Sequence, residues 1–334
     1  MPAAFKHIAV IGAGAWGSAL ACVFANTGRE VTLWAFEHDT VAEINTAHTN
    51  AHFLPGVSLP ATIKATSDLS TLADADVIFH VTPAQHTRAI SEQYAPHIRD
   101  GVPVVICAKG IEQLTHLLLS QVLKSTLPQA RLAVLSGPTF AHEVAAGLPA
   151  AATLASPDTG LATRLCGLFE ATPFRPYVGA DMIGAEVGGA VKNVIAIATG
   201  IAIGRKMGEN AAAALITRGL AEMTRFGVAL GGKADTFMGL SGLGDLSLTC
   251  NGPASRNMSL GVALGEGKLI DDILRTRKSV AEGYHTAGVV HEMAADRGIV
   301  MPVIDAVHAI LHEGADIDTV IAAILNRPFT KEAA

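Results

Sequence analysis

The feature that most constrains the fold is a glycine-rich motif that directly follows the first apolar segment of the chain. Residues 8–20 read Ile-Ala-Val-Ile-Gly-Ala-Gly-Ala-Trp-Gly-Ser-Ala-Leu, a G-x-G-x-x-G pattern between a predicted strand and a predicted helix. In this context Gly12 makes a tight turn, Gly14 lets the backbone approach a pyrophosphate, and Gly17 lets helix and strand pack closely. The N-terminus of the helix adds N–H donors and positive potential. The motif therefore predicts a Rossmann-type dinucleotide site, and a purely structural turn is the weaker alternative.

Strand-like and helix-like segments alternate from residue 7 to about residue 178, which predicts a mostly parallel sheet with helices on both faces. After Gly179 the sequence contains no convincing strand, and helix-like stretches follow one another. The predicted fold class is α/β, with an N-terminal Rossmann-type, doubly wound, mostly parallel sheet followed by an all-α C-terminal domain. We expect a dinucleotide-binding domain over 1–180 and a helical substrate and catalytic domain over 181–334. The expected strands cover residues 7–12, 30–34, 77–81, 102–108, 132–135, 151–155 and 174–178. The expected C-terminal helices cover residues 181–204, 209–230, 255–265, 286–297, 302–313 and 317–325.

Composition narrows the class of protein and the kind of ligand. Half of the 334 residues are apolar, 16% are charged and 33 are glycine, which suits a well-packed two-domain α/β enzyme. The formal charge of −6 argues against nucleic acid or an anionic membrane as partner, so a phosphorylated small molecule would need a local cluster of cations.

The four cysteines are too widely spaced for a metal site or a redox pair, so we expect no metal. The N-terminus lacks the regions of a signal peptide, and the longest apolar run, 194–204, is about half of the roughly 20 residues that span a bilayer. We expect a cytoplasmic protein without membrane insertion.

The predicted helix over 181–204 carries one lysine, Lys192, in otherwise apolar surroundings. Gly188 and Gly189 lie one turn before it, on the side toward which helical side chains lean. Glycine inside a helix costs about 1 kcal/mol relative to alanine, so the pair needs a physical reason. Either the glycines leave space for a ligand near the ammonium group, or they allow close helix packing while Lys192 extends to water.

Three loops follow predicted strands at the carboxyl edge of the sheet, where open α/β sheets bind ligands. Residues 81–83 (Val-Thr-Pro) end one strand, and Lys109 ends another within Ala-Lys-Gly. The third loop is Ser-Gly-Pro-Thr-Phe-Ala over 136–141, where Pro138 and Thr139 suit a helix start with free N–H groups for an anion. The alternatives are a solvated loop cation at Lys109 and an ordinary helix cap in the third loop.

A glycine-rich segment over 239–250 reads as an ordered loop, because apolar residues recur within it. It carries Asp245 and Thr249, and Ser-Arg-Asn follows at 255–257. A carboxylate, hydroxyls, a guanidinium and an amide so close in sequence suit a small polar ligand with a phosphate, which Arg256 would bind with two hydrogen bonds. Alternatively, Arg256 pairs with a surface acid and Asp245 caps a helix.

Taken in this order, the motifs resemble those of the NAD(P)-dependent glycerol-3-phosphate dehydrogenases. The segments that carry the resemblance are Gly-Ala-Gly-Ala-Trp-Gly, Ala-Lys-Gly, Ser-Gly-Pro-Thr-Phe-Ala, Gly-Ala-Val-Lys-Asn-Val, Gly-Leu-Gly-Asp-Leu-Ser-Leu-Thr-Cys and Ser-Arg-Asn. The resemblance spans residues 7 to about 326, and the Lys-Asn and Gly-Leu-Gly-Asp segments are its most diagnostic parts. It implies reversible hydride transfer between NAD(P)H and dihydroxyacetone phosphate, giving sn-glycerol 3-phosphate, a precursor for glycerophospholipid synthesis.

The resemblance also implies a role for individual residues, with Lys192 as the catalytic proton donor and acceptor at the carbonyl oxygen. The implied substrate-binding residues are Lys109, Gly137, Thr139, Lys192, Asn193, Asp245, Thr249, Ser255, Arg256 and Asn257. The implied cofactor-binding residues are Gly12, Gly14, Ala15, Trp16, Gly17, Phe36, Lys109, Ala141, Arg256, Val280 and Glu282. Elementary chemistry agrees for Lys192, because an ammonium group stabilises a developing alkoxide and supplies its proton, and burial brings the pKa of a lysine toward working pH.

The segment after the second predicted strand bears on the choice of cofactor. A ribose-binding carboxylate is expected about 20 residues after the glycine motif, where Glu37 stands in Trp-Ala-Phe-Glu, and no arginine or lysine is nearby to bind a 2′-phosphate. Phe36 makes the segment similar to the cytosolic eukaryotic enzymes, which use NAD, whereas many bacterial members carry Arg or His there. We therefore predict NAD, with NADP as the alternative.

Two other functions fit parts of the pattern. A reductase of the β-hydroxyacid or ketoacid type shares the two-domain organisation, but Lys109, Lys192 and Arg256 suit a phosphorylated substrate better than a single carboxylate. A nucleotide sensor without enzymatic activity would explain the glycine motif but gives no reason for Lys192 and Asn193 on the helix. We also expect a homodimer, since paired helices of the apolar C-terminal half would bury an exposed apolar face.

Overall fold

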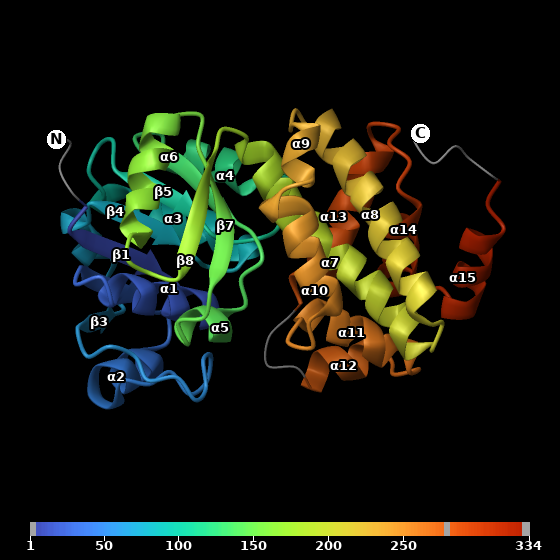
Figure 1. Cartoon of the computed structure of the whole chain (residues 1–334), viewed down its shortest axis with the longest axis horizontal. Helices are drawn as coiled ribbons and strands as arrows, with labels where there is room; N and C mark the ends of the chain where they lie inside the picture. Colours follow the sequence, from blue (N-terminus) through green and yellow to red (C-terminus); the bar gives the residue numbers. More distant parts are fainter. Residues whose placement is uncertain (1–4, 277–280, 329–334) are drawn as a thin grey trace.

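An eight-stranded sheet forms the first half of the structure, a computed structural model that describes residues 5–276 and 281–328 (Figure 1). The strands are β1 His7–Ile11, β2 Glu30–Trp34, β3 Ile63–Thr66, β4 Val77–His80, β5 Pro103–Ile106, β6 Arg131–Ser136, β7 Ala150–Ala155 and β8 Phe174–Gly179. Their order across the sheet is β3-β2-β1-β4-β5-β6-β7-β8, and neighbouring strands are parallel except for β6 with β7. The predicted mostly parallel, doubly wound sheet is confirmed.

The buried strands alternate their side chains between two cores, one on each face of the sheet. In β1, Ile8 and Val10 belong to the core that contains Phe24, whereas Ala9 and Ile11 belong to the core that contains Tyr94. A strand that is buried on both faces reads as a continuous apolar run, which is why the central strands were predictable.

Helices and 3-10 turns connect the strands and cover both faces of the sheet (Figure 1). They are α1 Ala15–Ala25, α2 His38–Ala47, η1 Leu69–Asp74, η2 Ala84–His86, α3 Thr87–Tyr94, η3 Ala95–His97, α4 Leu119–Thr126, α5 Ala141–Ala145, α6 Thr159–Cys166 and η4 Gly167–Phe169. The edge strand β3 was not predicted. It has four residues, of which Ile63 and Ala65 are buried and Lys64 is exposed, so its apolar pattern is too short to recognise.

The second half contains helices and no strand among its described residues, and its first helix begins at Met182, two residues being left between it and the end of β8 at Gly179. Its elements are α7 Met182–Gly204, α8 Glu209–Ala229, α9 Ala234–Phe237, the π-helical turn η5 Leu240–Gly244, α10 Asp245–Asn251, α11 Arg256–Gly265, α12 Ile270–Thr276, α13 Glu282–Ala295, α14 Pro302–His312 and α15 Ile317–Leu325. The helix α7 runs through the centre of this half (Figure 1). It is long and apolar enough to cross a membrane, but 89% of its most apolar window is buried inside the protein, so it is a core helix.

Glycines let α7 and α11 cross with their backbones in contact. A Cβ on Gly200 would lie 2.2 Å from the carbonyl oxygen of Met258, and a Cβ on Gly261 would lie 2.1 Å from a backbone oxygen of α7. Gly204 and Gly265 repeat the arrangement one turn later, with clashes at 2.4 and 2.5 Å. Any side chain at these four positions would force the two helices apart.

The segment over 239–250 is not the predicted loop, because it folds into η5 and α10. Its glycines serve close packing rather than chain flexibility. A Cβ on Gly242 would lie 2.1 Å from the carbonyl oxygen of Phe237, and a Cβ on Gly188 of α7 would lie 2.3 Å from the carbonyl oxygen of Ser241. Tertiary packing thus overrides the local preference that the glycines signal.

Candidate active site

The glycine motif forms a cradle between β1 and α1. Gly12 has a φ of 110°, which favours glycine, and its Cβ would lie 3.0 Å from the carbonyl group of Val81. A Cβ on Gly17 would lie 1.8 Å from the carbonyl oxygen of Gly12. Around Gly14, the N-cap of α1, no described atom outside its immediate neighbours lies within 4 Å of a Cβ position. This open space above a helix N-terminus fits the pyrophosphate of a dinucleotide, and it places Ala15 beside the same opening.

Trp16 lies in the first turn of α1 with its ring centroid 6.1 Å from that of Phe174. Its indole Nε1 is buried and has no hydrogen-bond partner among the described residues. A buried N–H group that lacks an acceptor is unfavourable, so a ligand at the cradle that brings an acceptor would improve its environment.

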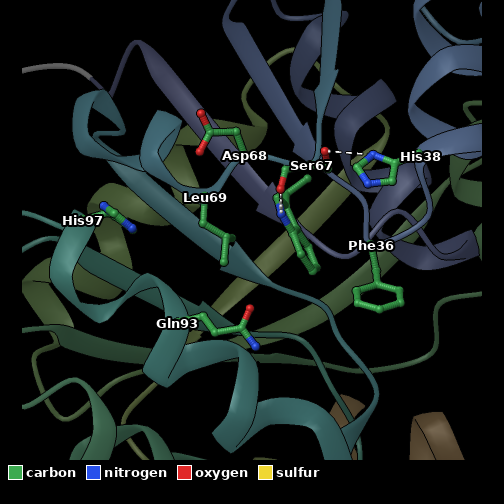
Figure 2. Close-up of a pocket in the computed structure, with 8 residues that line it drawn as sticks. Phe36, His38, Ser67, Asp68, Leu69, Gln93 and His97 are labelled. Atoms are coloured by element: carbon green, nitrogen blue, oxygen red, sulfur yellow. Dashed lines mark hydrogen bonds between the residues drawn. The ribbon is translucent and has the colours of Figure 1, made fainter.

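A pocket of about 370 Å³ opens beyond the end of β2, beside Phe36 (Figure 2). Its walls are formed by Trp34, Phe36, His38, Ser67, Asp68, Leu69, Gln93 and His97. Phe36 is 75% exposed, and Trp34 Nε1 donates a hydrogen bond to the carbonyl oxygen of Ser67 at 3.1 Å. None of these lining residues is an arginine or a lysine. Sequence reasoning missed the residues that follow β3, because that strand was not predicted.

Lys192 occupies the centre of a buried polar cluster between the two halves of the chain. The side chain is carried by α7 and the residue is 6% exposed. Its ammonium group donates hydrogen bonds to Oδ1 of Asp245 and, at 2.8 Å, to Oγ1 of Thr249. The hydroxyl of Thr249 in turn donates to the carbonyl oxygen of Asp245 at 2.6 Å. Lys192 therefore does not extend to water, so this part of the packing alternative was wrong.

Lys109 joins the same cluster from the loop that follows β5. Its Nζ donates to Oδ2 of Asp245 at 2.6 Å and to the carbonyl oxygen of Gly137 at 2.9 Å. The hydroxyl of Thr139 donates to the same carbonyl oxygen at 3.2 Å. Five of the predicted substrate residues are thus brought together around the carboxylate of Asp245. The helix α10, which carries Asp245, was not predicted. The alternative of a solvated loop cation at Lys109 was wrong.

The electrostatic environment of Lys192 is the one that proton transfer requires. Burial lowers the pKa of Lys192 to about 7, the carboxylate of Asp245 opposes this shift, and the nearby charge of Lys109 reinforces it. The ammonium group can therefore release and recover a proton near neutral pH.

The two glycines before Lys192 serve packing in different ways. Gly188 meets the backbone of Ser241, and a Cβ on Gly189 would lie 2.8 Å from Oγ of Ser136 and 3.3 Å from Cγ of Lys109. Gly189 therefore makes room for the stem of a second site lysine. The packing interpretation holds for both glycines.

Asn257 links α11 to α7 and α13. Its Nδ2 donates to Oδ1 of Asn193 at 2.8 Å, and its Oδ1 accepts from the backbone N–H of Gly283 at 3.0 Å. Ser255 is the N-cap of α11, where its hydroxyl accepts from the N–H of Met258 at 3.2 Å. In the structure both residues therefore bond to other protein groups and hold the start of α11 in place beside the site.

Arg256 and Glu282 are the first residues of α11 and α13, and their charges interact. Arg256 is exposed, whereas Glu282 is half-buried. Burial raises the pKa of Glu282, while the N–H of Ala84 and the charge of Arg256 lower it. Oε1 of Glu282 accepts from Ala84 at 3.3 Å, and Oε2 is buried with no hydrogen-bond partner in the described part of the chain. Ala141 begins α5, and the predicted cofactor residue Val280 lies outside the described residues.

These features, a Rossmann-type sheet with a glycine cradle followed by helices and a buried lysine cluster, define an α/β protein of the nicotinamide-dependent dehydrogenase class. Comparison with known families identifies the member of this class. The model of the NAD-dependent glycerol-3-phosphate dehydrogenase N-terminus matches residues 7–162, and the model of the C-terminus matches residues 181–322. The chain belongs to the NAD-dependent glycerol-3-phosphate dehydrogenase family.

Individual relatives agree with this assignment over the whole chain. A glycerol-3-phosphate dehydrogenase [NAD(P)+] of Parvibaculum lavamentivorans is 57% identical over 332 residues, which cover 99% of this chain and 100% of that protein. The crystal structure of glycerol-3-phosphate dehydrogenase from Coxiella burnetii has 41% identity and a TM-score of 0.93, covering 97% of this chain and 99% of that chain. The enzyme structure from Saccharomyces cerevisiae has 30% identity and a TM-score of 0.83, covering 96% and 99%. The family activity is the NAD(P)-dependent reduction of dihydroxyacetone phosphate, so the predicted family, fold class, activity and cofactor class are confirmed.

Proposed function

We propose that Lys192 is the proton donor when this chain reduces dihydroxyacetone phosphate, and that Asp245, Thr249 and Lys109 prepare it for that role. The observation that carries this proposal is the buried cluster in which Lys192 and Lys109 bind one carboxylate. A buried ammonium group with a pKa of about 7 is present in both protonation states at working pH, as a reversible acid and base must be.

The cofactor supplies a hydride to the carbonyl carbon of the substrate, and negative charge develops on the carbonyl oxygen. Lys192 stabilises this charge and transfers its proton to the oxygen, while the hydrogen bonds to Asp245 and Thr249 hold its Nζ in place. In the reverse reaction neutral Lys192 accepts the proton of the alcohol. Lys109 offsets the charge of Asp245, so the cluster is positive when Lys192 is protonated, which favours an anionic substrate in the reduction.

The phosphate end of the substrate is assigned to Arg256 and to the N-terminus of α11. Arg256 is the first residue of this helix and is exposed, so its guanidinium group is accessible from solvent. A guanidinium beside a helix N-terminus is a strong phosphate-binding arrangement, because the fork of N–H groups and the helix dipole act together. The support contacts of Asn193, Ser255 and Asn257 hold this end of α11 against α7 and α13.

We propose that the chain prefers NAD to NADP. The pocket beside Phe36 has the carboxylate of Asp68 in its wall and neither an arginine nor a lysine among its lining residues. A 2′-phosphate there would meet no arginine or lysine among the residues that line the pocket, whereas a ribose hydroxyl needs neither. The names of the bacterial relatives give NAD(P)+, which leaves both cofactors available within the family.

The deciding experiment follows the loss of reduced-cofactor absorbance when purified protein meets dihydroxyacetone phosphate, with NADH and NADPH in parallel. We expect turnover with both substrate and cofactor present and a higher kcat/KM with NADH. Turnover that is stronger with NADPH would contradict the NAD preference. Absence of turnover with either cofactor, together with tight cofactor binding, would contradict the role of Lys192.

We further propose that the chain works as two domains, 1–180 and 181–334, in a cytoplasmic homodimer whose product feeds glycerophospholipid synthesis. The apolar helix α15 supports the dimer, since none of its residues is fully buried and Leu325 is 72% exposed. Light scattering after size-exclusion chromatography would test it, and a mass of one chain at enzyme concentrations used in assays would contradict it.

A further inference from the structure

A buried histidine lies on the strand next to β1, paired with the residue that precedes the glycine cradle, and has no part in the chemistry described above. His80 is the last residue of β4 and is completely buried. Its Nε2 lies 2.7 Å from Oγ1 of Thr82, and its Nδ1 lies 3.2 Å from the hydroxyl oxygen of Tyr94. Both ring nitrogens thus have one side-chain partner each.

The protonation state of His80 limits how these two hydrogen bonds can be arranged. Burial lowers the pKa of His80 to about 3, so the ring is neutral and carries a single N–H group. One nitrogen must donate and the other must accept. Either Tyr94 donates to Nδ1 and Nε2–H donates to Thr82, or Thr82 donates to Nε2 and Nδ1–H donates to Tyr94.

Each arrangement leaves one buried hydroxyl hydrogen without an acceptor among the described residues, that of Thr82 in the first and that of Tyr94 in the second. In the second arrangement the O–H hydrogen of Tyr94 would need another acceptor, and the described residues provide none besides His80. A buried donor without an acceptor costs about 1–3 kcal/mol. The first arrangement satisfies Tyr94 and both ring nitrogens, and it leaves only the hydrogen of the Thr82 hydroxyl without an acceptor among the described residues. Thr82 is also buried, at 4% exposed, but it borders the glycine cradle, so a bound ligand can supply that acceptor, whereas the fully enclosed Tyr94 is out of reach of any ligand.

Thr82 lies beside the glycine cradle. Its backbone nitrogen would lie 3.1 Å from a Cβ on Gly12, so it borders the glycine cradle. Two residues later the N–H of Ala84 donates to Glu282 of the helical half at 3.3 Å. A Cβ on Gly110, beside Lys109, would lie 2.6 Å from Cβ of Ala84. The loop over 81–84 is therefore packed between the cradle and the catalytic cluster.

We propose that His80 is a positioning residue that presents the hydroxyl of Thr82 as a hydrogen-bond donor to an oxygen of the bound dinucleotide. This inference rests on the proposed function in one respect, namely that the cradle binds a nicotinamide dinucleotide. Tyr94 has no contact with the cofactor in this scheme and acts through the tautomer of His80.

A double-mutant cycle on cofactor affinity tests whether Tyr94 acts through His80 on Thr82. The variants are Thr82→Val, Tyr94→Phe and the double variant, and the measured quantity is the Kd for NADH by cofactor fluorescence. We expect Thr82→Val to raise the Kd about fivefold, the effect of one lost hydrogen bond, and Tyr94→Phe to raise it about twofold. In the double variant Tyr94→Phe should add nothing further, because the hydroxyl that it orients is gone.

Two further readouts separate positioning from a loss of structure. Thr82→Ser should restore the affinity, and kcat at saturating substrate and cofactor should change little in Tyr94→Phe, whose side chain does not touch the cofactor. Independent effects of the two substitutions, or an unchanged Kd in Thr82→Val, would overturn the proposal.

The tautomer can be measured without any activity. Nitrogen-15 labelled histidine in the wild-type protein should show the Nε2–H form for His80, assigned by the absence of that signal in His80→Asn. An Nδ1–H form would overturn the inference while leaving the proposed enzyme function untouched. Conversely, absence of turnover in the wild-type protein would count against the proposed function and not against the tautomer.

Discussion

Lys109 and Lys192 donate hydrogen bonds to different oxygens of one carboxylate, that of Asp245, although one lysine comes from the sheet and the other from α7. Two ammonium groups share one negative charge, so the cluster is positive when both lysines are protonated. Such a cluster attracts an anionic substrate and needs little reorganisation when charge develops on its carbonyl oxygen. Because the contact spans both halves of the chain, the proposed mechanism makes the activity depend on how α7 and α10 pack against the sheet.

Replacement of Lys192 by methionine tests the assigned proton donor. The methionine keeps the stem and removes the proton, so we expect Lys192→Met to lower kcat by about 10³-fold or more while the Kd for NADH stays near the wild-type value. Steady-state kinetics and cofactor fluorescence measure the two quantities. Lys124→Met on the exposed surface of α4 is the matched control and should behave as wild type. Unchanged turnover in Lys192→Met would remove this lysine from the mechanism.

The pH dependence should report the ionisation of Lys192. Its pKa is lowered to about 7 by burial, so the protonated form that reduction needs disappears as the pH rises through that value. We expect kcat/KM for reduction to fall above about pH 7, approaching tenfold per pH unit, and kcat/KM for alcohol oxidation to fall below it. Rate profiles in both directions measure these limbs. A reduction rate that stays level well into alkaline pH would contradict the assignment.

The parts of the fold that sequence could predict are those in which one segment determines its own structure. The strand over Ile8–Ile11 is a continuous apolar run, and the glycine motif after it has a known turn geometry, so both were predictable. The helix around Lys192 was predicted within one residue at its start, because its apolar pattern is long and Asp181 provides an N-cap.

The remaining features depend on contacts between segments that are distant in sequence. The glycines over 239–250 signalled a loop, but they allow η5 to pack against the backbone of α7. Lys109 and Lys192 share Asp245 only because the loop after β5, α7 and α10 meet in the folded chain, which no single segment of the sequence indicates. Ser67 and Asp68 reach the pocket beside Phe36 from the end of β3, a strand whose four residues carry too little pattern to be recognised.

Replacement of Arg256 by alanine tests the phosphate end of the site. Loss of a charged hydrogen bond to phosphate costs about 1.5–3 kcal/mol, so the KM for dihydroxyacetone phosphate should rise about 10- to 100-fold. Dihydroxyacetone lacks the phosphate, and its slow reduction should proceed equally in wild type and Arg256→Ala. Arg327→Ala, at an exposed position in the other end of the helical half, controls for the loss of a surface cation. Equal losses with both substrates would show that Arg256 supports the fold or the cofactor instead of the phosphate.

The contact between α7 and η5 links packing to catalysis, and a pair of glycine substitutions can separate the two. A Cβ on Gly188 would lie 2.3 Å from the carbonyl oxygen of Ser241, and neither backbone can yield without moving the other. Asp245 follows η5 directly, so the displacement should carry its carboxylate away from Lys192. We expect Gly188→Ala to lower the free energy of unfolding by about 1–3 kcal/mol and kcat by about tenfold or more.

Gly288 provides the matched control, because it also lies inside a helix, α13, but has space for a methyl group. The nearest heavy atom to its Cβ position is 3.7 Å away, an ordinary van der Waals distance. Gly288→Ala should therefore raise the free energy of unfolding by about 0.5–1 kcal/mol through helix propensity and leave kcat unchanged. Denaturant unfolding and steady-state kinetics on the two variants measure both effects. If Gly188→Ala matched Gly288→Ala in stability and turnover, the contact with Ser241 could not be what holds Asp245 against Lys192.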